Sequence, residues 1–117
     1  MIEHFRPSEF TCCCGNCYDM IDQESLYKLD LARTLADTSF VITSSWRCKD
    51  KNQEVRGKSN SAHLRGTAFD IACTSSSKRF DIVHALLDAG FNRIGIASTF
   101  IHADDDSNLM NNVIWTY

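Results

Sequence analysis

Two histidines and one aspartate are the residues best suited to chemistry in this sequence. His63 and Asp70 bound a segment that reads HLRGTAFD, and His102 lies in a second segment that reads FIHAD. Asp70 stands among apolar neighbours, and a carboxylate buried in such a run is costly unless it has a partner. A metal ion is one such partner. The small residues between His63 and Asp70 let the backbone pass close to a bound group.

The type and number of these side chains point to one kind of metal site. Two imidazoles and one carboxylate offer three nitrogen or oxygen ligands. Catalytic zinc typically keeps three protein ligands and leaves the fourth position to water, whereas structural zinc prefers four ligands, often cysteines. Taken singly, each residue has a plainer explanation: a strand histidine is usually structural, and Asp70 could cap a turn or pair with Arg65. The joint pattern favours zinc.

Asp104 follows His102 by two residues. Residues two apart in a strand share a face, so we expect His102 and Asp104 to point the same way while the alternate residues enter the core. A polar pair on one face of an apolar strand indicates the wall of a site. The next two acids, Asp105 and Asp106, are expected to be solvated turn residues.

Arg47 ends the run SSWR, which follows the β-rich run FVIT. An arginine at the end of a strand can present its forked donors to a carboxylate. Taken alone, such an arginine usually makes a surface ion pair.

The elements that must position these residues follow from periodicity and capping. The pattern predicts helices over 23–36 (capped by Asp22), 48–56 and from Ser76 or Ser77 to 89 (ended by Gly90), and strands over 40–43, 66–72, 93–97, 100–104 and 112–117. In the last helix, Phe80, Val83, His84 and Leu87 follow the spacing of a buried face. Helices and strands mix without a βαβ rhythm, which favours an α+β fold with a small antiparallel sheet and flanking helices.

Size and charge set limits on function. With 117 residues, we expect one domain over residues 1–117. The net charge of −3 gives no basic face for nucleic acid. No run approaches the roughly 20 apolar residues that span a bilayer, and the first residues do not read as a signal peptide. We therefore expect a monomer made in the cytoplasm, without nucleic-acid or membrane partners. It would reach a cell wall only through lysis or within a phage particle.

Six cysteines are many for this length. Cys12, Cys13, Cys14 and Cys17 crowd together, and the Cys14-x-x-Cys17 spacing suits zinc, but no second pair supplies the remaining ligands. A disulfide framework is not the default without a secretion signal. We favour free thiols, some of them buried in a tight turn, over a structural zinc.

The sequence resembles the zinc D-Ala-D-Ala carboxypeptidase family, within the wider lysostaphin, D-Ala-D-Ala peptidase and hedgehog group. The family motif S-x-H-x-x-G-x-A-x-D matches Ser61, His63, Gly66, Ala68 and Asp70. The motif F-I-H-x-D, preceded by a glycine segment, matches residues 100–104 and Gly95, and S-G-Y-R is echoed by SSWR. The ending NVIWTY is similar to that of short, phage-associated members.

The resemblance implies a hedgehog/D-Ala-D-Ala peptidase-like fold and a role for each matched residue. His63, Asp70 and His102 would bind Zn²⁺, Arg47 would hold the substrate's carboxylate or the developing oxyanion, and Ser61 would line the site. The implied activity is hydrolysis of peptidoglycan peptides by a metal-activated water, as a D,D-carboxypeptidase or endopeptidase, in the manner of a phage endolysin.

One departure from the family pattern bears on catalysis. Many relatives place an acidic general base three residues before the last histidine, where this chain has Thr99. Asp104 is the nearest replacement, either as the base or as a residue that only orients a ligand. The departure leaves an alternative function open: a zinc-containing cell-wall-binding or virion-associated module with impaired catalysis.

Overall fold

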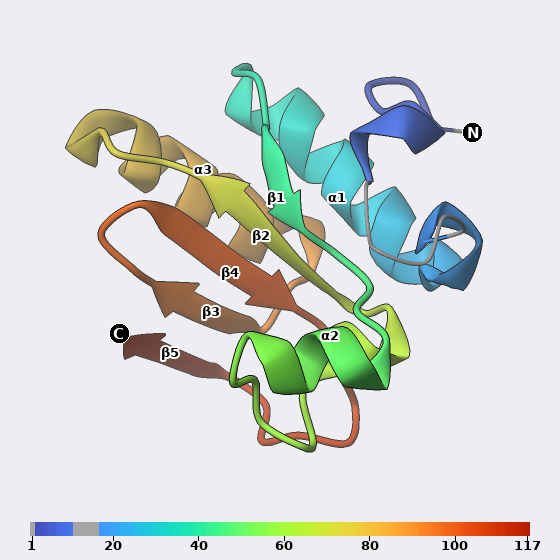
Figure 1. Cartoon of the computed structure of the whole chain (residues 1–117). Coiled ribbons are helices and arrows are strands. Elements are labelled where there is room, and N and C mark those ends of the chain that lie inside the picture. Colours follow the sequence, from blue (N-terminus) through green and yellow to red (C-terminus); the bar gives the residue numbers. More distant parts are fainter. Residues whose placement is uncertain (1, 11–16) are drawn as a thin grey trace.

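A five-stranded sheet with helices against it forms the centre of the molecule (Figure 1). The computed structural model describes residues 2–10 and 17–117. Its elements in chain order are η1 (Pro7–Glu9), η2 (Cys17–Met20), α1 (Gln23–Ala36), β1 (Ile42–Ser44), α2 (Lys49–Glu54), η3 (Ala62–Arg65), β2 (Ala68–Ala72), α3 (Ser76–Ala89), β3 (Arg93–Ile96), β4 (Phe100–Asp104) and β5 (Val113–Thr116), where η marks a 3₁₀ helix.

The strands lie in the order β1-β2-β4-β3-β5. All neighbours are antiparallel except β3 and β5, which run parallel. This exception follows from the register: Arg93 pairs with both Asp104, the last residue of β4, and Val113, the first residue of β5. The chain therefore leaves β4 and enters β5 at the same end of the sheet. The expected α+β fold is confirmed, with one parallel pair added to the antiparallel sheet.

Helices α1 and α3 cover one face of the sheet, while α2 lies at the other face (Figure 1). The capping prediction for α1 is confirmed, because the Asp22 side chain accepts a hydrogen bond from the Ser25 backbone at 3.0 Å. The buried core between the helices and the sheet includes Leu26, Leu29, Ala32, Phe69, Ile71, Ile82, Leu86, Ile94, Ile101 and Ala103. Alternate residues of β2 and β4 therefore point away from the helices, toward the site described below.

The buried face of α3 is not the predicted one. Phe80 and Leu87 are 71% and 43% exposed, and Phe80 stacks on the exposed His84. The face that meets the core carries Ile82, Ala85, Leu86 and Ala89. Both sets have the same helical spacing, so periodicity alone could not choose between them.

The described part of the N-terminal segment is irregular apart from η1 and η2, and two phenylalanines anchor it to the core. Phe5 and Phe10 are 7% and 2% exposed, and Phe10 meets Phe69 of β2 edge-on. The Asp30 carboxylate on α1 accepts backbone hydrogen bonds from Glu3 and His4. Within the described residues, no helix has both the length and the apolar character needed to cross a membrane.

The 3₁₀ helix η3 was not predicted, and it carries His63. Ser61 caps its start, and Gly66 ends it with a left-handed φ of 74°. A Cβ atom at Gly66 would lie 2.1 Å from the carbonyl oxygen of Met20, and the Gly66 carbonyl accepts the backbone N–H of Asp22. Gly66 thus holds η3 close to the segment that precedes α1.

We expect Gly66→Ala to lower the free energy of unfolding by about 3 kcal/mol, because the new methyl group meets backbone that must shift as well as an unfavourable φ. Gly90→Ala is the matched control. It also has a positive φ (111°), but its Cβ would meet only the flexible Lys28 side chain at 3.4 Å, so we expect a loss of about 1 kcal/mol. Urea denaturation measures both, and equal losses would contradict the close approach at Gly66.

Candidate metal centre

Three side chains from separate segments meet on the sheet face that the large helices leave uncovered. His63 lies on η3, Asp70 in the middle of β2 and His102 in the middle of β4. Asp70 and His102 are direct partners in the antiparallel register, which brings their side chains together. One ligand atom from each of the three residues lies within 4.8 Å of the other two. The three residues that the sequence singled out are therefore brought to one point.

The hydrogen bond on the far side of His63 decides which ring nitrogen faces that point. His63 Nδ1 lies 2.6 Å from the backbone oxygen of Ser45. A carbonyl can only accept, so Nδ1 carries the proton and donates it. The neutral ring then presents the lone pair of Nε2, which lies 3.3 Å from Asp70 Oδ1.

In His102 the two ring nitrogens have exchanged roles: Nε2 is the outer nitrogen, and Nδ1 faces the centre. Its Nε2 lies 2.6 Å from Asp104 Oδ2, and its Nδ1 lies 3.0 Å from Asp70 Oδ1. A carboxylate behind the outer nitrogen of a histidine is the usual support of a metal-binding imidazole. Nε2–H donates to Asp104, which leaves Nδ1 facing the same Asp70 oxygen as His63.

The two imidazole nitrogens and the Asp70 oxygen that face one another need a positive charge between them. Burial opposes ionisation of Asp70, yet when protons take the place of a metal ion, hydrogen bonds from His102 and His63 outweigh it and hold the pKa of this carboxyl well below its usual range. Burial likewise opposes the charged form of His102, but hydrogen bonds to Asp104 and Asp70 outweigh it and raise its pKa. The charge that stabilises this centre is positive, whether a proton or a metal ion carries it.

The donor set fits a zinc ion. Ligands at about 2.1 Å and tetrahedral angles lie about 3.4 Å apart, close to the 3.3 Å and 3.0 Å that separate the imidazole nitrogens from Asp70 Oδ1. Two nitrogens and one carboxylate oxygen are ligands that catalytic zinc accepts, with a fourth position left for water.

Asp104 lies behind His102 rather than beside the open side of the centre. It is 1% exposed. While Oδ2 faces His102, Oδ1 pairs with Arg93 Nε at 2.9 Å and accepts the Asp106 backbone N–H at 3.1 Å. Both oxygens are engaged, which favours the orienting role for Asp104 over that of a base.

Asp105 and Asp106 are not solvated turn residues. Asp105 pairs with Lys28 of α1 at 2.9 Å. Asp106 is 3% exposed and accepts hydrogen bonds from Arg65 and Thr67. Burial opposes ionisation of Asp106, but these hydrogen bonds and one from a backbone N–H outweigh it and lower its pKa. Because Asp106 takes the Arg65 side chain, it ties η3 and its histidine to the end of β4.

Arg47 and Ser61 lie together beside His63. The Arg47 backbone N–H donates to the His63 carbonyl at 3.1 Å, and Arg47 Nη2 donates to Ser61 Oγ at 3.1 Å. Arg47 Nε is buried and has no hydrogen-bond acceptor in the part of the chain that the structure describes. Among the described residues, no carboxylate lies within ion-pair distance of this guanidinium. Arg47 therefore has an unused donor next to the three ligands.

Sequence reasoning missed the side chains on the other flank of the centre. The Trp115 ring lies 5.3 Å from the His102 ring, and the Arg93 guanidinium lies over the Trp115 ring at 5.2 Å from its centroid. Gly95, which pairs with His102, makes room for this: a Cβ there would meet the indole at 2.6 Å. A glycine inside a predicted strand was the available signal of such a close approach.

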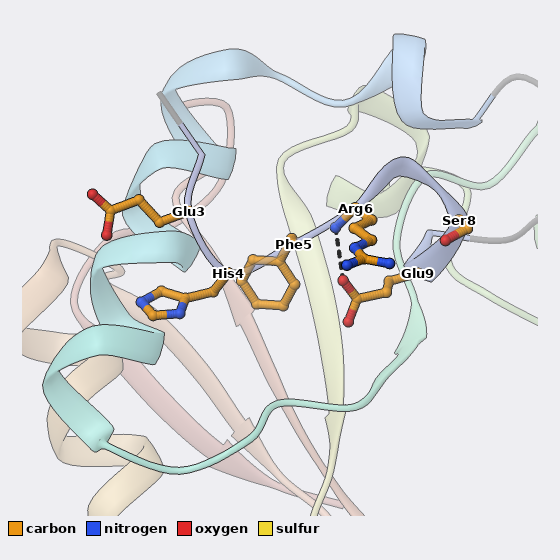
Figure 2. A pocket seen from close by; sticks show the side chains of 6 residues that line it. All are labelled: Glu3, His4, Phe5, Arg6, Ser8 and Glu9. Carbon is orange, nitrogen blue, oxygen red and sulfur yellow. Dashed lines mark hydrogen bonds between the residues drawn. The ribbon is translucent and has the colours of Figure 1, made fainter.

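Among the described residues, cavities also lie outside this cluster. One, of about 580 Å³, runs along the N-terminal segment and is bordered by residues such as Arg6 and Glu9 (Figure 2). None of the three ligands lines it. The second, of about 390 Å³, lies between Trp46, Arg47 and the start of α2. Because Arg47 lines it, the second cavity extends the surface on the Arg47 side of the centre.

A comparison with protein families agrees with the geometry. The pattern of the family Peptidase M15 matches residues 3–104, which include Arg47 and all three ligands of the centre. The chain belongs to the peptidase M15 family. A search among curated proteins found no match. Membership supports a metallopeptidase in general and implies a peptide substrate, in agreement with the resemblance drawn from its motifs.

Of the cysteine cluster, Cys17 alone lies within the described residues. Cys12, Cys13 and Cys14 lie outside the described residues, so the structure does not test a zinc site that includes them. Cys17 is buried and disulfide-bonded, so the expectation of a free thiol is wrong at this position.

Changing Asp104 separates its two predicted roles. If it orients His102, Asp104→Asn weakens zinc binding by about 10- to 100-fold, as loss of such a carboxylate does in other zinc sites. Competition with a chromogenic chelator measures this affinity. Asp88→Asn, an exposed change on α3, is the control and should bind zinc like the wild type. A variant with unchanged zinc affinity and no hydrolysis would instead favour Asp104 as the base.

Proposed function

We propose that this M15 protein is a zinc-dependent peptidase that hydrolyses peptidoglycan peptides, as a D,D-carboxypeptidase or an endopeptidase. The observation that carries the proposal is the convergence of two lone-pair nitrogens and one carboxylate oxygen on a single point. Both histidines have their outer nitrogens committed to acceptors, so the inner atoms are prepared for a metal ion. The restriction to cell-wall peptides rests on the motif resemblance.

His63 Nε2, Asp70 Oδ1 and His102 Nδ1 are the proposed ligand atoms. A zinc ion bound there would supply a Lewis acid that polarises the scissile carbonyl and activates water. Ser45 and Asp104 hold the two rings in the required orientation through their hydrogen bonds. Asp104 is proposed as a positioning residue, because its own charge is already balanced by Arg93.

Arg47 is the proposed substrate anchor. Its buried Nε has no acceptor in the described residues, and leaving such a charged donor unsatisfied is costly. A carboxylate of the substrate, or the oxyanion that forms at the scissile carbonyl, would satisfy it. Ser61 is proposed to hold the other branch of the guanidinium through its hydroxyl, and so to line the site.

A second candidate function is a zinc-containing module that binds the cell wall or a virion with impaired catalysis. Thr99 supplies no acid, and the two acids in the hydrogen-bond network of the described centre, Asp70 and Asp104, are both engaged. Incubation of the zinc-loaded protein with purified muropeptides distinguishes the two functions: release of D-alanine or cut cross-bridges supports the peptidase, and binding without products supports the module.

We expect the wild-type chain to bind about one zinc ion, and His63→Ala to lose both the zinc and the hydrolysis of muropeptides, because one of only three ligands is removed. His84→Ala is the control, since this exposed histidine on α3 lies outside the centre. Elemental analysis and chromatography of the products are the measurements. Full zinc content in His63→Ala would refute the ligand assignment.

Arg47→Ala should lower kcat/KM by about 100-fold while leaving the zinc content unchanged, since the side chain would meet the substrate and not the metal. Lys78→Ala, an exposed change on α3, removes one positive charge outside the site and serves as the control for net charge. Steady-state kinetics with muropeptides make the comparison. Equal losses in the two variants would reduce the role of Arg47 to general electrostatics.

A further inference from the structure

The sheet face that carries the metal centre ends in an aromatic edge, defined here as Trp115 and Tyr117. Trp115 pairs with Gly95, which in turn pairs with His102, so one row crosses β5, β3 and β4. Because Gly95 has no side chain, the indole lies over it and reaches to 5.3 Å from the His102 ring. The strand β5 therefore contributes directly to one flank of the metal centre.

Tyr117 continues this edge by one step. It follows Trp115 by two residues, and its backbone N–H donates to the Ile96 carbonyl at 3.2 Å, which extends the pairing of β5 with β3. Its ring packs against Phe100 at 5.1 Å, and Phe100 shares a face of β4 with His102. Tyr117 is nevertheless 68% exposed. It is a large aromatic side chain that is held in place on one side and open on the other.

Tyr117 lies within electrostatic range of the metal centre. Partial burial raises the pKa of its phenol, and the negative charge of Asp70 raises it further, while Trp115 and Arg47 lower it. Burial lowers the pKa of the Arg47 guanidinium, while Asp70 and Tyr117 favour its charged form and oppose that shift. In the strand order β1-β2-β4-β3-β5, Arg47 follows the strand at one edge of the sheet and Tyr117 follows the strand at the other, while Asp70 and His102 lie on β2 and β4 between these edges. The phenol and the guanidinium are within electrostatic range of each other.

We propose that the aromatic edge is the substrate-binding wall opposite Arg47, with Tyr117 as a specificity-determining residue and Trp115 as its support. The ligand is a peptide in extended conformation. Its main chain would lie over Asp70 and His102, with the Tyr117 ring against a peptide plane and the hydroxyl in reach of a carbonyl or carboxylate oxygen. This inference rests on the proposed function and names where the peptide lies in that same site.

The family match stops short of this wall, although the ending NVIWTY resembles that of short, phage-associated members. The match to Peptidase M15 covers residues 3–104 and ends with β4, whereas the aromatic edge lies in residues 115–117. The ligands and Arg47 belong to the matched part. Residues beyond it shape the second side of the site, where differences in peptide preference would arise.

The test uses the full-length, zinc-loaded chain and a synthetic stem pentapeptide that ends in D-Ala-D-Ala. We expect Tyr117→Ala to raise KM by about tenfold with little change in kcat, because an interaction common to the ground and transition states is lost. Tyr117→Phe, which keeps the ring, should raise KM by about threefold. Zinc content should stay at the wild-type level in both. Tyr27→Ala, an exposed tyrosine on α1, is the matched control and should behave as wild type.

A second measurement does not depend on hydrolysis. The chain has two tryptophans, so the indole N–H signals of Trp46 and Trp115 can be followed by NMR and assigned with Trp115→Phe. Adding the pentapeptide to zinc-free protein should shift the Trp115 signal in the wild type and in Tyr27→Ala, and shift it much less at the same peptide concentration in Tyr117→Ala.

The two readouts separate the proposals. A shift without hydrolysis by the zinc-loaded wild type would overturn the peptidase and leave the wall standing. Hydrolysis with the same KM in Tyr117→Ala, or loss of zinc from that variant, would overturn the wall and leave the peptidase. Absence of both shift and hydrolysis would overturn both.

Discussion

The contact on which the site depends is the one between Asp70 Oδ1 and the two imidazole nitrogens that face it, at 3.0 Å and 3.3 Å. The backbone register of β2 and β4 places Asp70 directly opposite His102, and η3 brings His63 over the same point. Three acceptor atoms this close repel one another unless a positive charge lies between them. Folding of the rest of the chain offsets the free-energy cost of this repulsion. A cation bound between the three atoms removes part of that cost.

The surrounding residues balance charge so that the centre can be buried. Asp104 supports His102 but would itself be an unpaired buried carboxylate, and Arg93 prevents that. Arg93 in turn lies over Trp115, whose indole covers Gly95. These contacts run outward from His102 through Asp104 and Arg93 to Trp115 on β5. Each residue in this series is needed because of the one before it. A change in the outer residues is therefore transmitted to the orientation of His102.

Local elements and the grouping of His63, Asp70 and His102 could be predicted from the sequence, because their signals are local. Asp22 as a cap, the helix 23–36 and the residues of two short motifs needed no knowledge of distant contacts. Other features depend on contacts between distant segments. The buried face of α3, the burial of Asp106 by Arg65 and the direction of β5 follow from which segments meet in space. The role of Asp104 also belongs here, because spacing showed its face of the strand but not that Arg93 would occupy its second oxygen.

The parallel strand β5 explains why the two sides of the site are so different. On one side, Arg47 and Ser61 lie in irregular backbone between β1 and η3 and present charge and hydroxyl groups. On the other, β5 adds a regular edge whose alternation places Trp115 and Tyr117 on the face of the metal centre. Because β4 ends and β5 begins beside the same residue, Arg93, the short connection 105–112 leaves this strand no other direction. The route that gives the sheet its one parallel pair thus also places an aromatic surface next to His102.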